Sequence, residues 1–178
     1  VIQWEKDQTE DAGLVKIDLL GNRSLAVIRD ALAAVARNTG RVIDYATWDP
    51  LSDPATNELI RRGDTMGCFY VESPATRLLL KKLWVGMPPA RRAVADVFEY
   101  LVVVSSIIRP AANVFADEFV RRAHGQRYQS LHPLFDEVLA ETHGIMVYQE
   151  DVMNVAVALG GFSVEDGDQL RKVLSKKH

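Results

Sequence analysis

One apolar run carries two charged residues at a spacing that could support chemistry. Within the stretch 13–21, Lys16 and Asp18 stand two positions apart, with apolar residues at the alternate positions. In a β-strand, side chains at i and i+2 point to the same face, so the amine and the carboxylate would stand side by side. The carboxylate could hold a divalent metal ion, and the ammonium group could meet a phosphate. A half-buried strand whose charged pair faces water explains the same pattern.

A second candidate group lies near the C-terminus, where the segment 171–177 carries four cations and no acid. Residues one helical turn apart share a helix face, so these cations would gather on one side of a helix. A basic helix face can bind a triphosphate or a phosphodiester backbone. Cations at a helix end also complement the helix dipole, so a solvated helix end is the alternative. The four cations are Arg171, Lys172, Lys176 and Lys177.

Arg109 and Pro110 follow the most apolar segment of the chain, 90–108. A guanidinium group that leaves the core at a helix end can bind an anion. It can equally well donate hydrogen bonds to the last carbonyls of its own helix. Both interpretations remain open at this point.

The stretch 148–153 combines polar groups with two acids at the predicted start of a helix. Glu150 and Asp151 could be catalytic, but acids at this position more often complement the helix dipole. Tyr148 and Gln149 could contact a base or a sugar. The histidines lack the spacing of zinc ligands, and the sequence contains no phosphate-binding P-loop, dinucleotide fingerprint or serine nucleophile motif.

Composition limits the class of protein. The 178 residues are 48% hydrophobic and carry a net charge of -3, so we expect one ordinary domain with no overall attraction to nucleic acid. The single cysteine, Cys68, cannot form an internal disulfide, which predicts a buried thiol and a cytoplasmic location. No apolar run is long enough to span a bilayer, and there is no signal peptide. The chain begins without Met, which suggests a piece of a longer protein.

Hydrophobic periodicity and capping residues predict a mainly helical chain with a small β component. Short strands are expected at 13–20 and 66–71, with a further short apolar segment at 145–147. Expected helices, bounded by residues such as Asn22, Asp53 and Ser73, cover 22–38, 54–62, 74–84, 90–108, 113–124, 132–142, 148–159 and a last segment that starts near 164.

Several stretches, taken together, resemble one family in their order and spacing. The stretch 13–21 resembles the palm motif of the bacterial C-family DNA polymerases, the alpha subunits of DNA polymerase III. Each motif alone is weak, but their agreement in register over essentially the whole chain is specific. The other matching stretches are Gln3-Trp4, Phe69 to Ser73, Ile108 to Pro110, Arg122 to Gly125, Thr142 to Glu150, Asp168 to Lys172, and Lys176-Lys177.

The resemblance implies a fold and an activity. The fold would be α+β, with a palm-edge strand segment over 1–21 and a helical fingers segment over 22–178. The parent would be a DNA-directed DNA polymerase that uses Mg²⁺, primer–template DNA and deoxynucleoside triphosphates. Other replication proteins would be possible partners, and no membrane would be involved.

The resemblance also implies roles for particular residues. Asp18 matches the third of three metal-binding palm aspartates, and Lys16 matches a lysine beside the triphosphate, which makes both catalytic candidates. The nucleotide- or DNA-binding candidates are a loop near the nascent base pair and the basic groups of the fingers. These are Arg109, Pro110, Arg171, Lys172, Lys176 and Lys177.

Departures from the family pattern suggest a divergent, error-prone branch. Ala111 and Ala112 stand where the family has Gly-Pro, and Lys172 replaces the second arginine of the basic pair. The two other metal-binding aspartates of the family would lie before Val1. We therefore expect the isolated chain to lack polymerase activity and not to bind Mg²⁺. The rival hypothesis is a non-catalytic helical module that binds DNA, nucleotide or a partner protein.

Overall fold

The structure is a computed structural model that describes residues 3–15, 17–109 and 113–175. Within these ranges the regular elements are all helices, and none of these helices has the length and hydrophobicity needed to cross a membrane. In chain order they are α1 (Lys6–Asp11), α2 (Arg23–Thr39), α3 (Pro54–Arg62), α4 (Pro74–Gly86), α5 (Pro89–Val94), α6 (Val97–Ile107), α7 (Asn113–Ala123), α8 (Pro133–Val138), a short 3₁₀ helix η1 (Ala140–Thr142), α9 (Gln149–Gly160) and α10 (Val164–Ser175).

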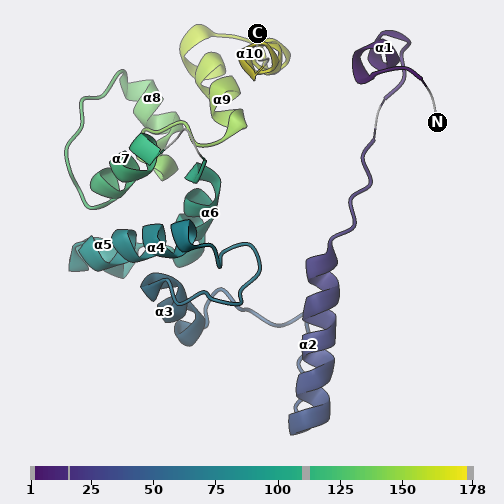
Figure 1. Cartoon of the computed structure of the whole chain (residues 1–178). Coiled ribbons are helices and arrows are strands. Elements are labelled where there is room, and N and C mark those ends of the chain that lie inside the picture. The colour runs from purple at the N-terminus through teal and green to yellow at the C-terminus, as the bar shows by residue number, and fades with distance from the viewer. Residues whose placement is uncertain (1–2, 16, 110–112, 176–178) are drawn as a thin grey trace. The chain divides into compact units, whose positions relative to one another are not determined.

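The chain divides into two compact units, Val1–Trp48 and Asp49–His178. The first unit contains α1 and the 17-residue helix α2, which Figure 1 shows in purple and blue. Asn22 begins α2 because its side-chain oxygen accepts a hydrogen bond from the Ser24 amide at 3.2 Å. Gly40 ends it in the left-handed conformation, with φ of 71°. The helix predicted over 22–38 is confirmed, although none of its residues is buried.

Neither predicted strand is present in the described residues. Residues 17–20 belong to no helix or strand, and Ile17 and Leu19 are three-quarters or more exposed instead of packed. A strand needs a partner to satisfy its backbone groups, and the described residues supply none. The stretch 66–71 folds into successive turns, with the Cys68 amide donating to the Thr65 carbonyl at 3.1 Å. The prediction of a strand there was wrong, and so was that of a buried thiol, because Cys68 is exposed.

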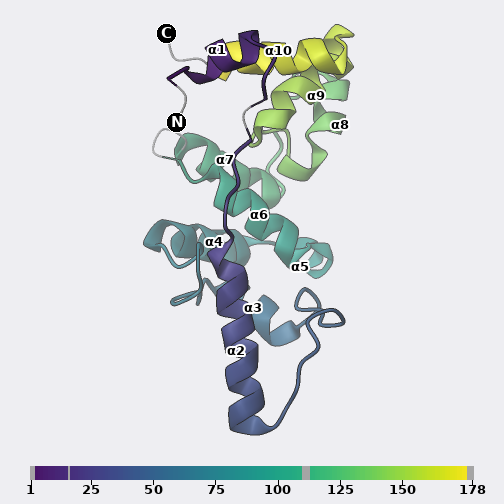
Figure 2. The ribbon, with the colours of Figure 1, turned by 90° about the vertical axis from the view of Figure 1, so that its right-hand side faces the viewer.

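The core of the second unit is built on the apolar face of α4. Leu80, Leu83 and Trp84 are fully buried, and they pack with Val104 of α6 and Phe119 of α7. Figures 1 and 2 both show α4, α6 and α7 next to one another. Close packing at this core fixes the ends of α6 and α7, from which the candidate site is approached.

Two predicted helices are each divided in the structure. The helix expected over 90–108 is split into α5 and α6 because Asp96 caps a new helix, accepting hydrogen bonds from the Phe98 and Glu99 amides at 2.7 and 3.0 Å. The helix expected over 132–142 ends at Val138 and continues as η1. Side-chain competition for backbone amides causes the first break, which an apolar pattern alone does not reveal.

Candidate phosphate-binding site

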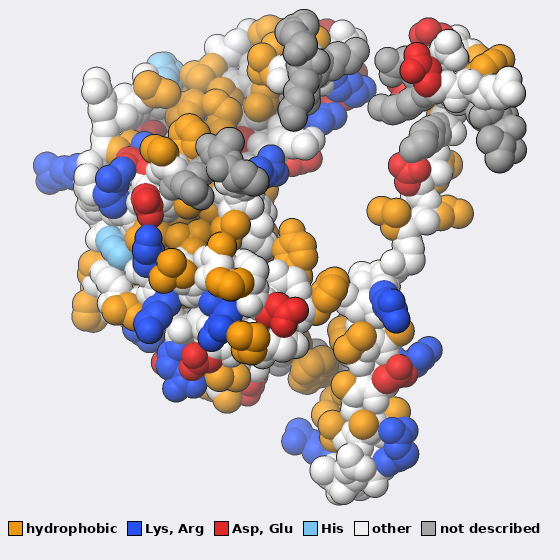
Figure 3. Space-filling model, viewed as in Figure 1, with side chains coloured by type: hydrophobic (Ala, Val, Ile, Leu, Met, Phe, Trp, Pro, Cys, Tyr) orange, Lys and Arg blue, Asp and Glu red, His pale blue; other side chains and the backbone are white. Residues whose placement is uncertain are grey.

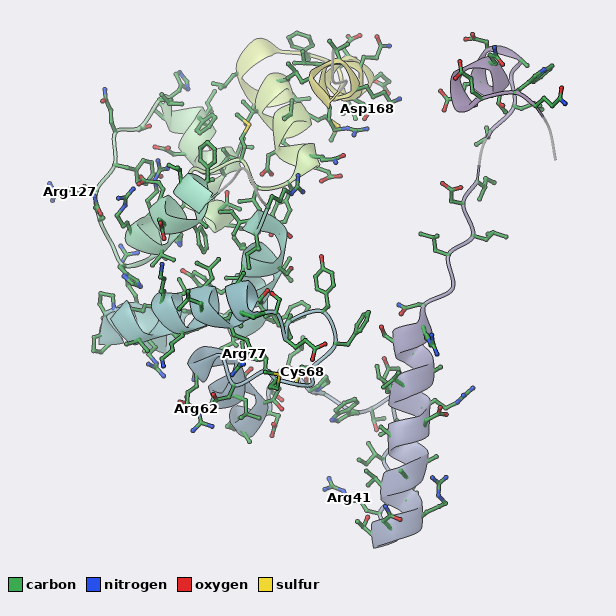
Figure 4. The ribbon with its side chains drawn as sticks, in the orientation of Figure 1. Arg41, Arg62, Cys68, Arg77, Arg127 and Asp168 are labelled. Atoms are coloured by element: carbon green, nitrogen blue, oxygen red, sulfur yellow. The ribbon has the colours of Figure 1, made fainter. Side chains whose placement is uncertain are left out.

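Helix α10 places two cations and one acid on a single face. Asp168, Arg171 and Lys172 stand at i, i+3 and i+4, so their side chains meet on this helix. Arg171 donates from Nε and Nη2 to Asp168 Oδ1 at 2.9 and 2.7 Å, and Lys172 Nζ lies 3.0 Å from Asp168 Oδ2. Figure 4 labels Asp168 on α10, and Figure 3 shows Lys and Arg side chains beside acidic ones there.

The charge of this group is positive overall. Hydrogen bonds from Arg171 and then Lys172 hold the pKa of Asp168 below its usual range, so the carboxylate is ionised at neutral pH. Two cations then face one anion, which leaves one positive charge on a partly exposed helix face. A phosphate oxygen has the same hydrogen-bonding needs as the Asp168 carboxylate, so it could take that carboxylate's place.

Gln149 connects α10 to the start of α9. Its Oε1 accepts a hydrogen bond from Arg171 Nη1 at 3.1 Å, so the guanidinium group of Arg171 is held from two helices. The two helices pack against each other along their length. Arg171 is therefore three-quarters buried, in contrast to the freely solvated helix end that was the alternative interpretation.

Asp151 fixes the backbone at the start of α9. It is buried, and its Oδ2 accepts hydrogen bonds from the Val147 and Tyr148 amides, both at 2.8 Å. These amides begin the helix and have no partner within it, so the carboxylate satisfies them and complements the helix dipole. Asp151 is thus a structural residue that positions Tyr148 and Gln149, in agreement with the sequence-based preference for a dipole role.

A polar pocket of about 330 Å³ lies beside this helix start. Its walls include Arg109 from the end of α6, Tyr148 and Gln149 from the start of α9, and Tyr70 from the turns before α4. Arg109 is exposed and makes no hydrogen bond or ion pair within the described ranges, so it does not bond the last carbonyls of α6 there. The pocket therefore brings Arg109 into the same neighbourhood as Gln149, which is the hydrogen-bond partner of Arg171.

A buried polar network supports the segment that leads into α9. Tyr100 Oη and His143 Nε2 lie 3.0 Å apart, and Arg122 Nη1 donates to the carbonyls of His143 and Gly144 at 2.9 and 3.2 Å. Burial, together with Arg91 and Arg122, lowers the pKa of His143, so its ring is neutral near pH 7. The structural role expected for this histidine before a glycine is confirmed.

The remaining predicted site residues are not brought into this group. Asp18 is exposed and belongs to the first unit, whereas the pocket and α10 belong to the second. Four predicted residues lie outside the described residues: Lys16, Pro110, Lys176 and Lys177. Their roles stay predictions, as does the role of Asp18.

The described residues do not form a magnesium site. Mg²⁺ in phosphoryl-transfer enzymes is held by one or more carboxylates together with substrate phosphates, and two-metal sites need several acids. Asp18 is a single exposed carboxylate, and no group of three or more metal-ligating side chains occurs in the ranges that the structure describes. The donor set in the described chain therefore does not fit a complete metal centre.

Two links in the site were missed at the level of sequence. The role of Asp168 could have been read from its spacing, because an acid three and four residues before two cations predicts ion pairs on a helix. The bond between Gln149 and Arg171 spans 22 residues and depends on how α9 and α10 pack, so no local pattern signals it. The lining of the pocket by Tyr70 likewise follows from tertiary structure.

Comparisons with known proteins agree with this helical architecture. Residues 24–178 match the family model described as the bacterial DNA polymerase III alpha subunit finger domain. The chain is 37% identical over 176 residues to a DNA polymerase III subunit alpha of Chlamydia pneumoniae, covering 98% of the chain and 13% of that protein. A Neisseria meningitidis serogroup A protein of the same name is 37% identical, with 99% of the chain and 14% of that protein covered.

A third relative, the DNA polymerase III subunit alpha of Staphylococcus aureus strain COL, is 36% identical over 99% of the chain and 16% of its own length. The chain thus spans about one seventh of the length of the curated relatives it matches. The resemblance inferred from the motifs is confirmed by these matches. The chain belongs to the bacterial DNA polymerase III alpha subunit finger domain family.

Proposed function

We propose that this chain supplies the nucleotide-binding fingers of a DNA-directed DNA polymerase that extends a primer on a DNA template. Arg171 and Lys172 bind the triphosphate of the incoming nucleotide. The observation that carries the proposal is the guanidinium group of Arg171, oriented on α10 and bonded to Gln149 at the edge of a polar pocket. A planar guanidinium group with several donors matches the geometry of phosphate oxygens.

The other predicted residues are assigned to the same enzyme. Arg109 and Pro110 form a loop near the nascent base pair, and Lys176 and Lys177 contact nucleotide or DNA phosphates. In the palm-edge segment 1–21, Asp18 is a metal ligand and Lys16 contacts the triphosphate. Residues 22–178 constitute the fingers.

In the longer polymerase, Mg²⁺ supplies the Lewis acidity for in-line phosphoryl transfer. The residues of this chain bind and orient the triphosphate, and their cations offset its negative charge. Partners of the parent enzyme are primer–template DNA, deoxynucleoside triphosphates and other proteins of cytoplasmic DNA replication. Because the chain holds one of three expected aspartates, the isolated chain does not extend a primer, and a primer-extension assay with Mg²⁺ tests this point.

Titration of the chain with dATP and with inorganic tripolyphosphate tests the phosphate site. Loss of hydrogen bonds to a charged group is worth roughly 1.5–3 kcal/mol, so Arg171→Ala should weaken binding of both probes about tenfold or more. Lys172→Ala, which removes one point charge, should weaken binding less.

Arg121→Ala is the matched control, because Arg121 also pairs with an acid three residues earlier on a helix, donating from Nε to Glu118 at 3.1 Å. It lies on α7, away from the pocket lining, and should leave both affinities unchanged. Equal affinities for wild type, Arg171→Ala and Arg121→Ala, with circular dichroism showing intact helices, would count against the phosphate site.

A further inference from the structure

Two aromatic side chains from distant parts of the chain line the polar pocket beside the phosphate site. Tyr70 comes from the turns before α4, and Tyr148 comes from the start of α9. The pocket volume of about 330 Å³ lies at the small end of the range for small-molecule sites, roughly 300–1,000 Å³. Between the two tyrosines, Arg109 and Gln149 contribute the hydrogen-bonding groups of the wall.

The backbone holds Tyr70 in an uncommon conformation. Its φ is 72°, one of only two positive values among the described non-glycine residues, and its side chain is 71% exposed. Hydrogen bonds on both sides keep the turn in place: Thr65 Oγ1 donates to the Val71 carbonyl at 2.7 Å, and the Gly67 amide donates to Glu72 at 3.2 Å. An exposed aromatic ring on a strained turn beside a pocket is an arrangement found at ligand sites.

The chemistry of these walls selects a flat, polar ligand. Tyrosine rings offer faces for stacking, which every nucleobase can use regardless of its identity. Arginine and amide side chains can bond to base edges or to a sugar. Gln149 uses its Oε1 for Arg171, and its amide nitrogen is the donor that remains for a ligand.

We propose that Tyr70 and Tyr148 form a stacking site for an unpaired nucleobase, next to the phosphate site of Arg171 and Lys172. This inference rests on the proposed function, because Gln149 joins the two sites and gives the base and the phosphates of one strand or nucleotide adjacent places. Two sources share this chemistry: the base of an incoming nucleoside triphosphate and an unstacked base of single-stranded DNA.

Four probes separate the contributions when titrated into the full 178-residue chain. They are dATP, inorganic tripolyphosphate, a short oligodeoxythymidylate, and an abasic strand of the same length. The test variants are Tyr70→Ala and Tyr70→Phe. Phe69→Ala is the matched control, because Phe69 is equally exposed and adjacent in sequence but does not line the pocket.

Tyr70→Ala should weaken binding of a base-containing probe about tenfold, whereas Tyr70→Phe and Phe69→Ala should bind like wild type. Tripolyphosphate and the abasic strand should be unaffected by all three variants. A loss confined to dATP assigns the site to the incoming nucleotide, and a loss confined to the oligodeoxythymidylate assigns it to single-stranded DNA.

The inference is overturned if Tyr70→Ala binds dATP and the oligodeoxythymidylate as wild type does. It is also overturned if Tyr70→Ala and Phe69→Ala weaken all four probes alike. Failure of the proposed phosphate site gives a different result, namely tripolyphosphate affinity that does not respond to Arg171→Ala.

Discussion

Asp151 offers a quantitative test of how the start of α9 is held. The residue is buried, and one carboxylate oxygen accepts from two backbone amides at 2.8 Å each. Asp151→Ala would leave the amides of Val147 and Tyr148 without this partner in a place that water reaches poorly. Asp151→Asn would keep an acceptor oxygen of the same size but remove its charge.

The magnitudes follow from these contacts. Hydrogen bonds to a charged group contribute roughly 1.5–3 kcal/mol, and neutral ones about 1 kcal/mol. The two bonds share one acceptor and are not additive, so Asp151→Ala should lower the free energy of unfolding by about 3 kcal/mol. Asp151→Asn should lower it by about 1 kcal/mol. Glu150→Ala, the neighbouring exposed acid, should change it by less than about 0.5 kcal/mol.

Urea denaturation followed by circular dichroism measures these values. The well-folded Asp151→Asn variant should also bind tripolyphosphate more weakly than wild type, because a loosened helix start no longer fixes Gln149 against Arg171. Equal stability of Asp151→Ala and Glu150→Ala would refute the claim that this carboxylate anchors the site.

Three further predictions concern the site and its support. Asp168→Asn should bind tripolyphosphate roughly two- to fivefold more tightly, because the phosphate no longer displaces an ion-paired carboxylate while Gln149 still holds Arg171; weaker binding in the same titration would show that Asp168 only positions the cations. Because the pKa of His143 is lowered in the folded state, the unfolded chain takes up its proton first, so stability should fall as pH drops through about 6.5, and His143→Gln should flatten that dependence in urea midpoints measured on both sides of this pH; an unchanged slope would contradict the assignment. Gly144→Ala should destabilise the fold by about 1–3 kcal/mol more than Gly161→Ala by thermal or urea denaturation, since both have positive φ but a Cβ at 144 would lie 2.9 Å from Tyr128 Oη, whereas the one at 161 meets open space; similar losses for both would point to backbone strain alone.

Much of the helical fold could be predicted from local sequence. Asn22, Asp53 and Ser73 each cap a helix where the sequence indicated one, because a capping hydrogen bond joins residues two or three positions apart. The break at Asp96 was missed because the surrounding apolar residues continue the helical pattern. The turns at 66–71 were mistaken for a strand, since a short apolar run does not reveal the glycine conformation that bends it.

The candidate site could be predicted only in part. Arg171 and Lys172 were identified from their spacing and from the family resemblance, and the structure shows how α10 orients them. The contact with Gln149 and the approach of Tyr70 to Tyr148 depend on helix packing and on turn geometry. Long-range contacts of this kind leave no periodic signal in the sequence. The pairing of Lys16 with Asp18 remains a prediction.

Backbone amide chemical-shift mapping during titration with tripolyphosphate tests the central claim most directly. The account predicts that the largest saturable shifts fall on Gln149, Arg171 and Lys172, and that Arg171→Ala abolishes them while leaving the rest of the spectrum unchanged. Shifts that are absent at these residues, or that concentrate on another basic surface such as Arg121 of α7, would contradict it.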